Sequence, residues 1–271
     1  MRSKRTWWKI SLVLALAAIV LVLRFKGIIF TSVHPAFNLL ESQRISRRIA
    51  GYKVLDDKDF YIQYNIKDKD AAYSLQSIAN SWGSEVLNFF QYEHSEQVGI
   101  VLYSREEELK GVLRIPQGQS ALGAYAGGKI NLLSPDSLSS MNQGSDSLVN
   151  VFVHELAHLV VDDIGKGNYP LWFTEGSALY LEYDLLDYEW GSGLDPNNMS
   201  SLDDLTYHFS SLDEDMAYRE SFLLVKGLIG EYGRDSYVRF LHDLGEGKEF
   251  NAALMDIYGI TTLDVQKYVD L

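Results

Sequence analysis

Two histidines and a glutamate stand at a spacing that suits metal-dependent hydrolysis. Residues 154–158 read His-Glu-Leu-Ala-His within an apolar run that has helical periodicity. Residues four apart share one face of an α-helix, so the imidazoles of His154 and His158 can reach the same ion. Glu155 projects beside them, where its carboxylate can serve as a general base without being a ligand. The pentapeptide therefore indicates a zinc hydrolase.

A helix must position these side chains, and the flanking residues predict one. Ser145 or Asp146 can cap its start and Gly165 can end it. The histidines lie off the apolar stripe of this helix, which consists of Val149, Phe152, Val153, Leu156 and Val160. The competing interpretation is an ordinary amphipathic helix that carries two histidines and binds no metal. The next segment of the chain favours the metal site.

That segment supplies a possible third ligand. Residues 169–176 read Tyr-Pro-Leu-Trp-Phe-Thr-Glu-Gly, in which Pro170 suits a first helical turn and an apolar pattern continues to Tyr183. A catalytic zinc takes three protein ligands and keeps one open position, and Glu175 offers the missing carboxylate. Gly176 would let two helices approach closely. The alternative for Glu175 is a solvated acid at a helix N-terminus, where the helix dipole favours it.

Together the two motifs resemble the gluzincin metallopeptidases, and within them the peptidase MA-like domains, whose pattern is His-Glu-x-x-His followed by Trp-x-x-Glu-Gly. In looser form the resemblance covers residues 55–270. It implies one catalytic Zn²⁺ held by His154, His158 and Glu175. It also implies that Glu155 is the general base and that the substrate is a peptide or protein.

The sequence departs from the family pattern at one position. Thermolysin-like members carry an aspartate four residues after the glutamate ligand, where it orients a ligand histidine, whereas this chain has Leu179. Asp162, one turn beyond His158, is our candidate for that orienting function. The alternative is an acid that is simply solvated near a helix end.

The oxyanion of a tetrahedral intermediate needs a hydrogen-bond donor, which gluzincins often supply as a Tyr or His downstream of the ligands. Tyr218 is our candidate, because Met-Ala-Tyr-Arg-Glu-Ser resembles the Tyr-x-x-Ser helix that follows the second motif in peptidase MA-like chains. A tyrosine on a helix is also often a core residue with a hydrogen-bonded hydroxyl. His208 is a weaker competitor, since it can equally be an exposed loop histidine.

The periodicity of the rest of the chain predicts an α+β fold, with a sheet-containing N-terminal half and a helical C-terminal half from Leu148 onward. The expected elements are a strand at 60–66, a helix at 71–90, a strand at 98–103, a helix at 105–112 and a hairpin at 121–133 that turns at Gly127-Gly128. Helices are expected at 216–232 and 236–244, and a loop at 184–214. The resemblance implies a zincin-like, thermolysin-like domain in which the hairpin borders the cleft.

The first thirty residues carry a membrane signal. An apolar run at 10–23 follows four basic residues and is flanked by aromatic side chains. The basic residues are Arg2, Lys4, Arg5 and Lys9, and the aromatic residues are Trp7, Trp8 and Phe25. Its length suits either a signal peptide or a spanning helix, and the lack of small residues just after it favours an uncleaved anchor. The excess of basic residues before the run predicts a single-pass cell-membrane protein with an extracytoplasmic catalytic domain.

This interpretation divides the chain into three parts. Residues 1–30 are the predicted cytoplasmic tail and transmembrane signal-anchor, residues 31–54 a juxtamembrane linker or helix, and residues 55–271 the zinc metallopeptidase domain. After residue 30 the chain has 18 basic against 37 acidic side chains, a net charge of −19, which argues against nucleic acid as a partner. The absence of cysteine excludes disulfides and thiol catalysis.

Two functional hypotheses from different classes follow. The first is a membrane-anchored, extracytoplasmic zinc peptidase. The second is a catalytically silent zincin-like domain that binds a cell-surface partner. This second hypothesis would be favoured if Glu155 or a ligand were replaced by another residue. All four motif residues are intact, so the sequence favours the enzyme.

Overall fold

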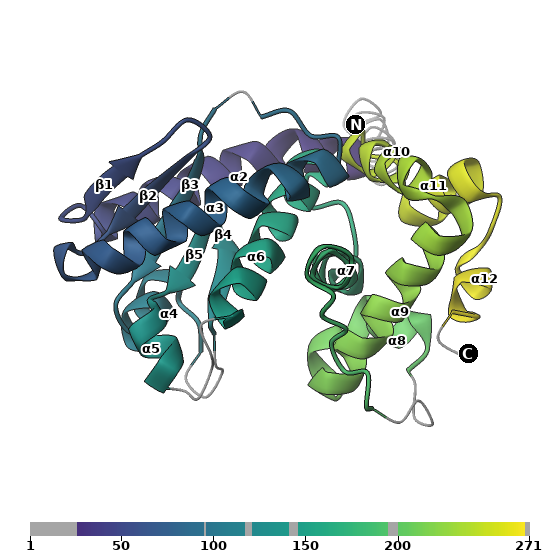
Figure 1. The fold of residues 1–271 in the computed structure, drawn as a ribbon. Helices are drawn as coiled ribbons and strands as arrows, with labels where there is room; N and C mark the ends of the chain where they lie inside the picture. Colours follow the sequence, from purple (N-terminus) through teal and green to yellow (C-terminus); the bar gives the residue numbers. More distant parts are fainter. Residues whose placement is uncertain (1–25, 95, 117–120, 141–145, 195–199, 269–271) are drawn as a thin grey trace, which may run out of the picture.

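The chain folds around a mixed five-stranded sheet. The computed structural model describes residues 26–94, 96–116, 121–140, 146–194 and 200–268. Within these residues the strand order is β1-β2-β3-β5-β4, with β2, β3 and β5 parallel and both edge strands antiparallel to their neighbours (Figure 1). The strands are β1 Lys53–Asp56, β2 Phe60–Tyr64, β3 Val98–Tyr103, β4 Gly123–Ala126 and β5 Lys129–Leu133. The predicted α+β class is confirmed.

The two central strands are buried along their whole length. Every residue of β3 and of β5 is buried, as expected for parallel strands that are covered on both faces. The hairpin from β4 to β5 turns at Gly127 and Gly128, whose φ angles of +59° and +68° lie in the left-handed region that such a tight turn requires. The predicted hairpin and its turn are confirmed, and β4 forms one edge of the sheet.

Helices cover both faces of the sheet. Helices α3 (Lys69–Phe89) and α6 (Asp146–Gly165) pack on one face, and α2 (Lys26–Arg48) crosses the other (Figure 1). Helix α4 (Glu106–Leu113) contacts α2, β3 and β5, and the short α5 (Pro135–Ser140) precedes α6.

The C-terminal half is helical, as predicted, and α7 (Leu171–Leu186) joins it to the sheet half. Figure 1 shows α7 between α6 and α9, and it packs extensively on both. The remaining helices are α8 Leu202–His208, α9 Glu214–Tyr232, α10 Arg234–Gly245, α11 Phe250–Tyr258 and α12 Thr262–Gln266.

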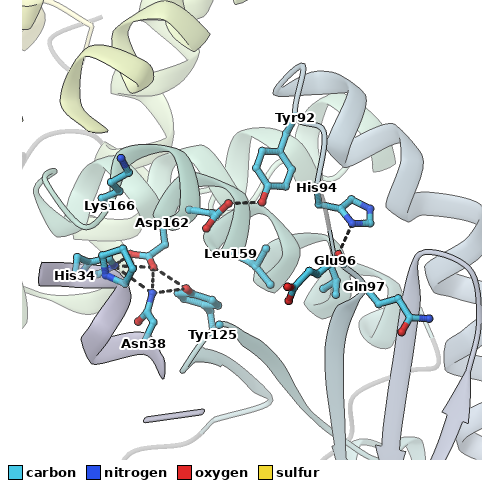
Figure 2. A pocket seen from close by; sticks show the side chains of 14 residues that line it. His34, Asn38, Tyr92, His94, Glu96, Gln97, Tyr125, Leu159, Asp162 and Lys166 are labelled. Carbon is cyan, nitrogen blue, oxygen red and sulfur yellow. Dashed lines mark hydrogen bonds and ion pairs between the residues drawn. The ribbon is translucent and has the colours of Figure 1, made fainter. Parts of the chain in front are cut away.

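Helix α2 is attached to the domain by specific polar contacts. Nε2 of His34 and Nδ2 of Asn38 lie 2.9 Å and 2.8 Å from Oδ2 of Asp162 on α6, and the hydroxyl of Tyr125 on β4 donates to the same oxygen at 2.6 Å (Figure 2). The hydroxyl of Tyr169, just before α7, donates to Oδ1 of Asp162 at 2.9 Å. A single buried carboxylate therefore connects α2, β4, α6 and the start of α7.

Two sequence expectations need correction. The Asp- and Ser-rich segment 184–214 was expected to be a loop, but it contains helix α8, because Leu202 and Leu205 bury one face of a short helix and the Ser201 hydroxyl accepts from the backbone N–H of Asp204. The strand expected at 60–66 ends at Tyr64, and residues 66–68 form a 3₁₀ turn.

The segment predicted as a linker or helix, 31–54, contains most of α2 and the first residues of β1. The predicted transmembrane segment at 10–23 lies outside the described residues. Among the helices that the structure does describe, none is both long and apolar enough to span a bilayer.

Gly176 allows α7 and α9 to approach closely. A Cβ atom at this position would lie 2.1 Å from the carbonyl oxygen of Ser221 on α9, which is far inside van der Waals contact. Gly230, also on α9, has open space within 4 Å of the corresponding position.

We therefore expect Gly176→Ala to lower the free energy of unfolding by about 1–3 kcal/mol, because the added methyl group forces the two helices apart. The control Gly230→Ala should raise it by about 0.5–1 kcal/mol, since alanine favours a helix where space is free. Urea denaturation with chelator present, so that metal binding does not contribute, measures both. Equal effects of the two substitutions would contradict the close packing of α7 on α9.

Candidate metal centre

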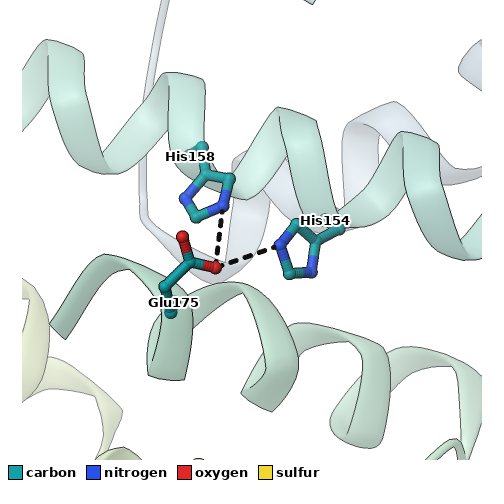
Figure 3. Close-up of side chains that lie close together, drawn as sticks. All are labelled: His154, His158 and Glu175. Atoms are coloured by element: carbon teal, nitrogen blue, oxygen red, sulfur yellow. Dashed lines mark ion pairs between the residues drawn. The ribbon is translucent and has the colours of Figure 1, made fainter. Parts of the chain in front are cut away.

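Three side chains predicted as ligands converge between α6 and α7. His154 and His158 project from successive turns of α6, and Glu175 faces them from the first turns of α7 (Figure 3). Oε2 of Glu175 lies 3.5 Å from Nε2 of each histidine. The imidazole rings are 4.7 Å apart and nearly perpendicular, so both Nε2 atoms face the same point.

Each histidine is oriented by a hydrogen bond at its other nitrogen. Nδ1 of His154 lies 2.7 Å from Oε1 of Glu182, and Nδ1 of His158 lies 2.7 Å from the hydroxyl of Thr174. A carboxylate only accepts hydrogen bonds, so Nδ1 of His154 carries the proton and its Nε2 presents a lone pair. The Thr174 hydroxyl can accept from His158 in the same way. Both Nε2 lone pairs then point toward the Glu175 carboxylate.

This arrangement fits a metal ion. Three lone-pair donors that face one another repel unless a cation lies among them, and Oε2 of Glu175 is buried without any hydrogen-bond donor. All three candidate ligand atoms lie within 4.8 Å of one another. Ligands about 2.1 Å from a tetrahedral ion are about 3.4 Å apart, close to the two separations from Glu175. The set of two imidazoles and one carboxylate suits zinc.

The electrostatics of the cluster also favour positive charge. Burial would raise the pKa of the Glu175 carboxyl, but the nearness of His158 and His154 holds it well below its usual range. Burial opposes protonation of His154, yet its contacts with Glu175 and Glu182 raise its pKa well above the ordinary value. Two buried carboxylates thus attract a cation to this point, either a proton on His154 or a metal ion.

Glu155 lies beside the three candidate ligands without being one of them. Its side chain is 7% exposed, its Oε2 has no hydrogen-bond partner, and its carboxylate accepts a hydrogen bond from the backbone of Tyr125 on β4. Burial raises the pKa of this carboxyl. Strand β4 is close enough that a Cβ at Gly123 would lie 3.0 Å from Cγ of Glu155. The edge strand therefore fixes the position of the predicted general base.

A pocket of about 390 Å³ opens onto the cluster, and Tyr218 lines it together with both histidines and Glu175. The Tyr218 side chain hydrogen-bonds Glu175, and its ring packs on Trp190 and Phe209. His208, the competing oxyanion donor, is exposed at the end of α8 and does not line this pocket. The structure thus brings Tyr218, and not His208, to the candidate ligands.

Asp162 does not orient a ligand histidine, contrary to the sequence hypothesis. Its carboxylate is saturated by the contacts with α2, β4 and Tyr169 described above. Its effect on the site is indirect: it holds the side chain of Tyr125, whose backbone binds Glu155.

The residues that do orient the histidines were missed from the sequence. Glu182 follows Glu175 by seven residues, two helical turns that return to the same face of α7, and Thr174 directly precedes Glu175. Leu179, where thermolysin-like members have their aspartate, is a buried core residue. A search for an acid at the second-turn spacing would have found Glu182.

Comparison with known proteins agrees with this geometry. A family model described as Peptidase MA superfamily matches residues 91–269, a region that includes both motifs and every helix from α6 to α12. The match confirms the resemblance inferred from the motifs, and the mixed sheet followed by helices fits such a domain. No curated protein matches the chain significantly.

We expect Glu182→Gln to weaken zinc affinity about 10- to 100-fold without unfolding the protein, because the neutral amide no longer stabilises the proton on Nδ1 of His154. The matched control is Asp184→Asn, which replaces an exposed acid on the same helix with its neutral amide and should leave zinc affinity unchanged. His158→Ala should release the metal. Competition with a chromophoric chelator and elemental analysis measure these effects. Full zinc occupancy in His158→Ala would refute the ligand assignment.

Proposed function

We propose that this chain, which belongs to the Peptidase MA superfamily, is a zinc-dependent peptidase that hydrolyses peptide bonds of a peptide or protein substrate. One observation carries the proposal: the lone pairs of two oriented imidazoles meet an unpartnered carboxylate oxygen in a pocket that also holds a buried, non-ligand glutamate. His154, His158 and Glu175 are the proposed zinc ligands, and Glu155 and Tyr218 are the proposed catalytic residues.

Zinc held by the three ligands would make a water molecule acidic near neutral pH and polarise the scissile carbonyl. Glu155 then moves the proton. Its unpartnered Oε2 accepts a proton from the attacking water, whose oxygen adds to the carbonyl carbon. As the carbon–nitrogen bond breaks, the same carboxyl delivers this proton to the leaving amine. The hydrogen bond from the Tyr125 backbone keeps Glu155 in place through both transfers.

Tyr218 is suited to stabilise the oxyanion of the tetrahedral intermediate. Burial, together with the negative charge of Glu175 and Glu214, raises the pKa of its hydroxyl, so the hydroxyl keeps its proton at neutral pH and remains a donor. Without substrate it bonds Glu175. To donate to the oxyanion, the hydroxyl gives up its hydrogen bond to Glu175 and forms one to the oxyanion in the same pocket.

The edge strand β4 can position an extended substrate. Gly123 and Ala124 line the pocket, and β4 lies at the edge of the sheet. A substrate that pairs with a sheet edge gains main-chain hydrogen bonds that depend little on its side chains. We therefore expect the enzyme to accept many different side chains in the segment of the substrate that pairs with β4.

The protein is further proposed to be membrane-anchored, with its catalytic domain outside the cytoplasm. The support is the apolar run at 10–23, preceded by four basic residues, together with the aromatic residues at its ends. In this scheme residues 1–30 form the tail and anchor, 31–54 the juxtamembrane segment and 55–271 the peptidase domain.

A catalytically silent zincin-like domain that binds a cell-surface partner is the competing function. It predicts metal binding without hydrolysis, whereas the intact Glu155 and its unpartnered oxygen favour the enzyme. Digestion of a peptide library by the zinc-loaded protein separates the two, since a silent domain cleaves no peptide.

We expect Glu155→Gln to abolish hydrolysis while zinc is retained, because the amide cannot accept the proton of the attacking water. Tyr218→Phe should lower turnover by about 100- to 1000-fold, the typical effect of one oxyanion donor. Tyr207→Phe, which removes the hydroxyl of a largely exposed tyrosine, is the control. Steady-state kinetics and zinc analysis measure each variant. Turnover near the wild-type value in Tyr218→Phe would remove Tyr218 from the mechanism.

We also expect the native protein to remain in the membrane fraction, with the residues after Phe30 accessible from outside the cell. Protease shaving of intact cells, followed by immunodetection of the retained N-terminal segment, tests this topology. Recovery of a freely soluble form that starts near residue 31 would show instead that the N-terminal segment is a cleaved signal.

A further inference from the structure

Helix α2 exposes a row of large apolar side chains. Ile29, Val33, Phe37 and Leu40 are each more than two-fifths exposed, and Phe37 and Leu40 reach 64% and 63%. Their spacing of three and four residues places them on one broad side of the helix, which we call the outer face. A contiguous apolar surface of this kind on a folded domain usually marks an interaction site.

The opposite side of α2 is fixed to the domain, so the outer face has a defined direction. Thr31 and Ile45 are buried, and His34 and Asn38 contact the Asp162 carboxylate. These contacts lie along most of the length of the helix. The helix cannot turn to bury its apolar residues without breaking them.

The position of α2 in the chain indicates what covers the outer face. The described part of the helix starts at Lys26, and the apolar run 10–23 ends just before it in the sequence. If that run crosses a bilayer, the first turn of α2 lies at the level of the lipid headgroups. An apolar face that starts there is next to lipid, whereas any protein partner would have to displace lipid to reach it.

The charges on α2 also match a bilayer surface. Glu41, the single acidic residue of α2, is paired with Arg44, while the exposed side chains of Lys26 at one end and of Arg47 and Arg48 at the other are basic. Basic residues around an apolar helix face are typical of helices that lie in the headgroup region. Because the chain after residue 30 has a net charge of −19, overall charge would not draw the domain to an anionic membrane. Attachment must come from the apolar face.

We propose that the outer face of α2 lies in the interface of the bilayer that holds the N-terminal anchor. This inference rests on the membrane anchor of the proposed function. It adds that the domain is held against the lipid surface in one orientation, instead of swinging on a flexible tether. Since Asp162 links α2 to α6 one turn after His158, the helix also sets the height of the catalytic pocket above the membrane. The substrates that reach this pocket most readily are the membrane-proximal segments of other proteins.

The absence of cysteine allows a direct test with the full-length protein. Leu40→Cys on the outer face and Leu263→Cys on α12, another exposed leucine at 85%, are each labelled with an environment-sensitive fluorophore. The proteins are reconstituted in vesicles of equal parts phosphatidylcholine and phosphatidylglycerol. We expect the label at position 40 to shift to the blue and to be quenched severalfold by lipids with doxyl groups on their acyl chains. The label at position 263 should respond only to an aqueous quencher.

A second variant tests whether the apolar face causes the insertion. Ile29→Asp combined with Val33→Asp should move the label at position 40 into water. The control is Tyr207→Asp combined with Leu263→Asp, which adds two acids at exposed positions away from α2 and should leave that label in the lipid. Aqueous quenching of the position-40 label in the otherwise unaltered protein would overturn the proposal. The proposal would also be overturned if the label at position 40 were shielded from both quenchers, and only at high protein density. That result would show that a second copy of the protein covers the outer face.

The outcomes separate this inference from the proposed function. Vesicle flotation reports the anchor: if the protein does not float with vesicles, the anchor is wrong and the inference fails with it. If the protein floats and the label at position 40 is in water, only the inference fails. None of these measurements depends on peptidase activity, and they can be repeated in Glu155→Gln.

Discussion

The structure depends on the contact between α6 and α7. All three candidate ligands come from these two helices, and the groups that orient the histidines, Thr174 and Glu182, also come from α7. A change in the spacing or rotation of α7 would therefore move one ligand and both orienting groups at once. The close approach at Gly176 sets that spacing from the far side, because it fixes α7 against α9. Helix packing thus positions the candidate metal site.

The sheet contributes by fixing α6 and Glu155. Most side chains of α6 are buried, since the helix packs on α3, α7, α10 and the strands β4 and β5. Its long contact with the sheet places Glu155 within reach of the backbone of Tyr125. The side chain of Tyr125 is in turn held by Asp162, so one tyrosine connects the proposed general base to the polar network around Asp162. Preorganisation of this kind means that little needs to move when substrate binds.

The sequence predicted most accurately the features that depend on local geometry. The pair of candidate ligands on α6 follows from helical periodicity alone, and the strand at 98–103 and the Gly127-Gly128 turn follow from an apolar run and a two-glycine signal. Features that depend on tertiary partners were missed. Helical spacing put Asp162 near His158, but its partners on α2 and β4 are distant in sequence and draw its side chain away. The sequence around Glu182 does not distinguish it from an exposed acid on a helix, because its burial depends on the packing of α7 on α6.

The position of the pocket explains why a buried polar network is maintained here at all. His154 and His158 lie on α6, which packs on the sheet, and Glu175 lies on α7, which packs on α9, so the site exists only when these two halves are docked in one register. An apolar interface would resist separation but would allow small slips, whereas the hydrogen bond that Asp162 on α6 accepts from Tyr169, just before α7, requires a narrow range of directions. A metal ion shared by α6 and α7 would add a second constraint of the same kind across the same junction. Folding of the domain and formation of the site are then one process, since the contacts that align the halves are those that build the pocket.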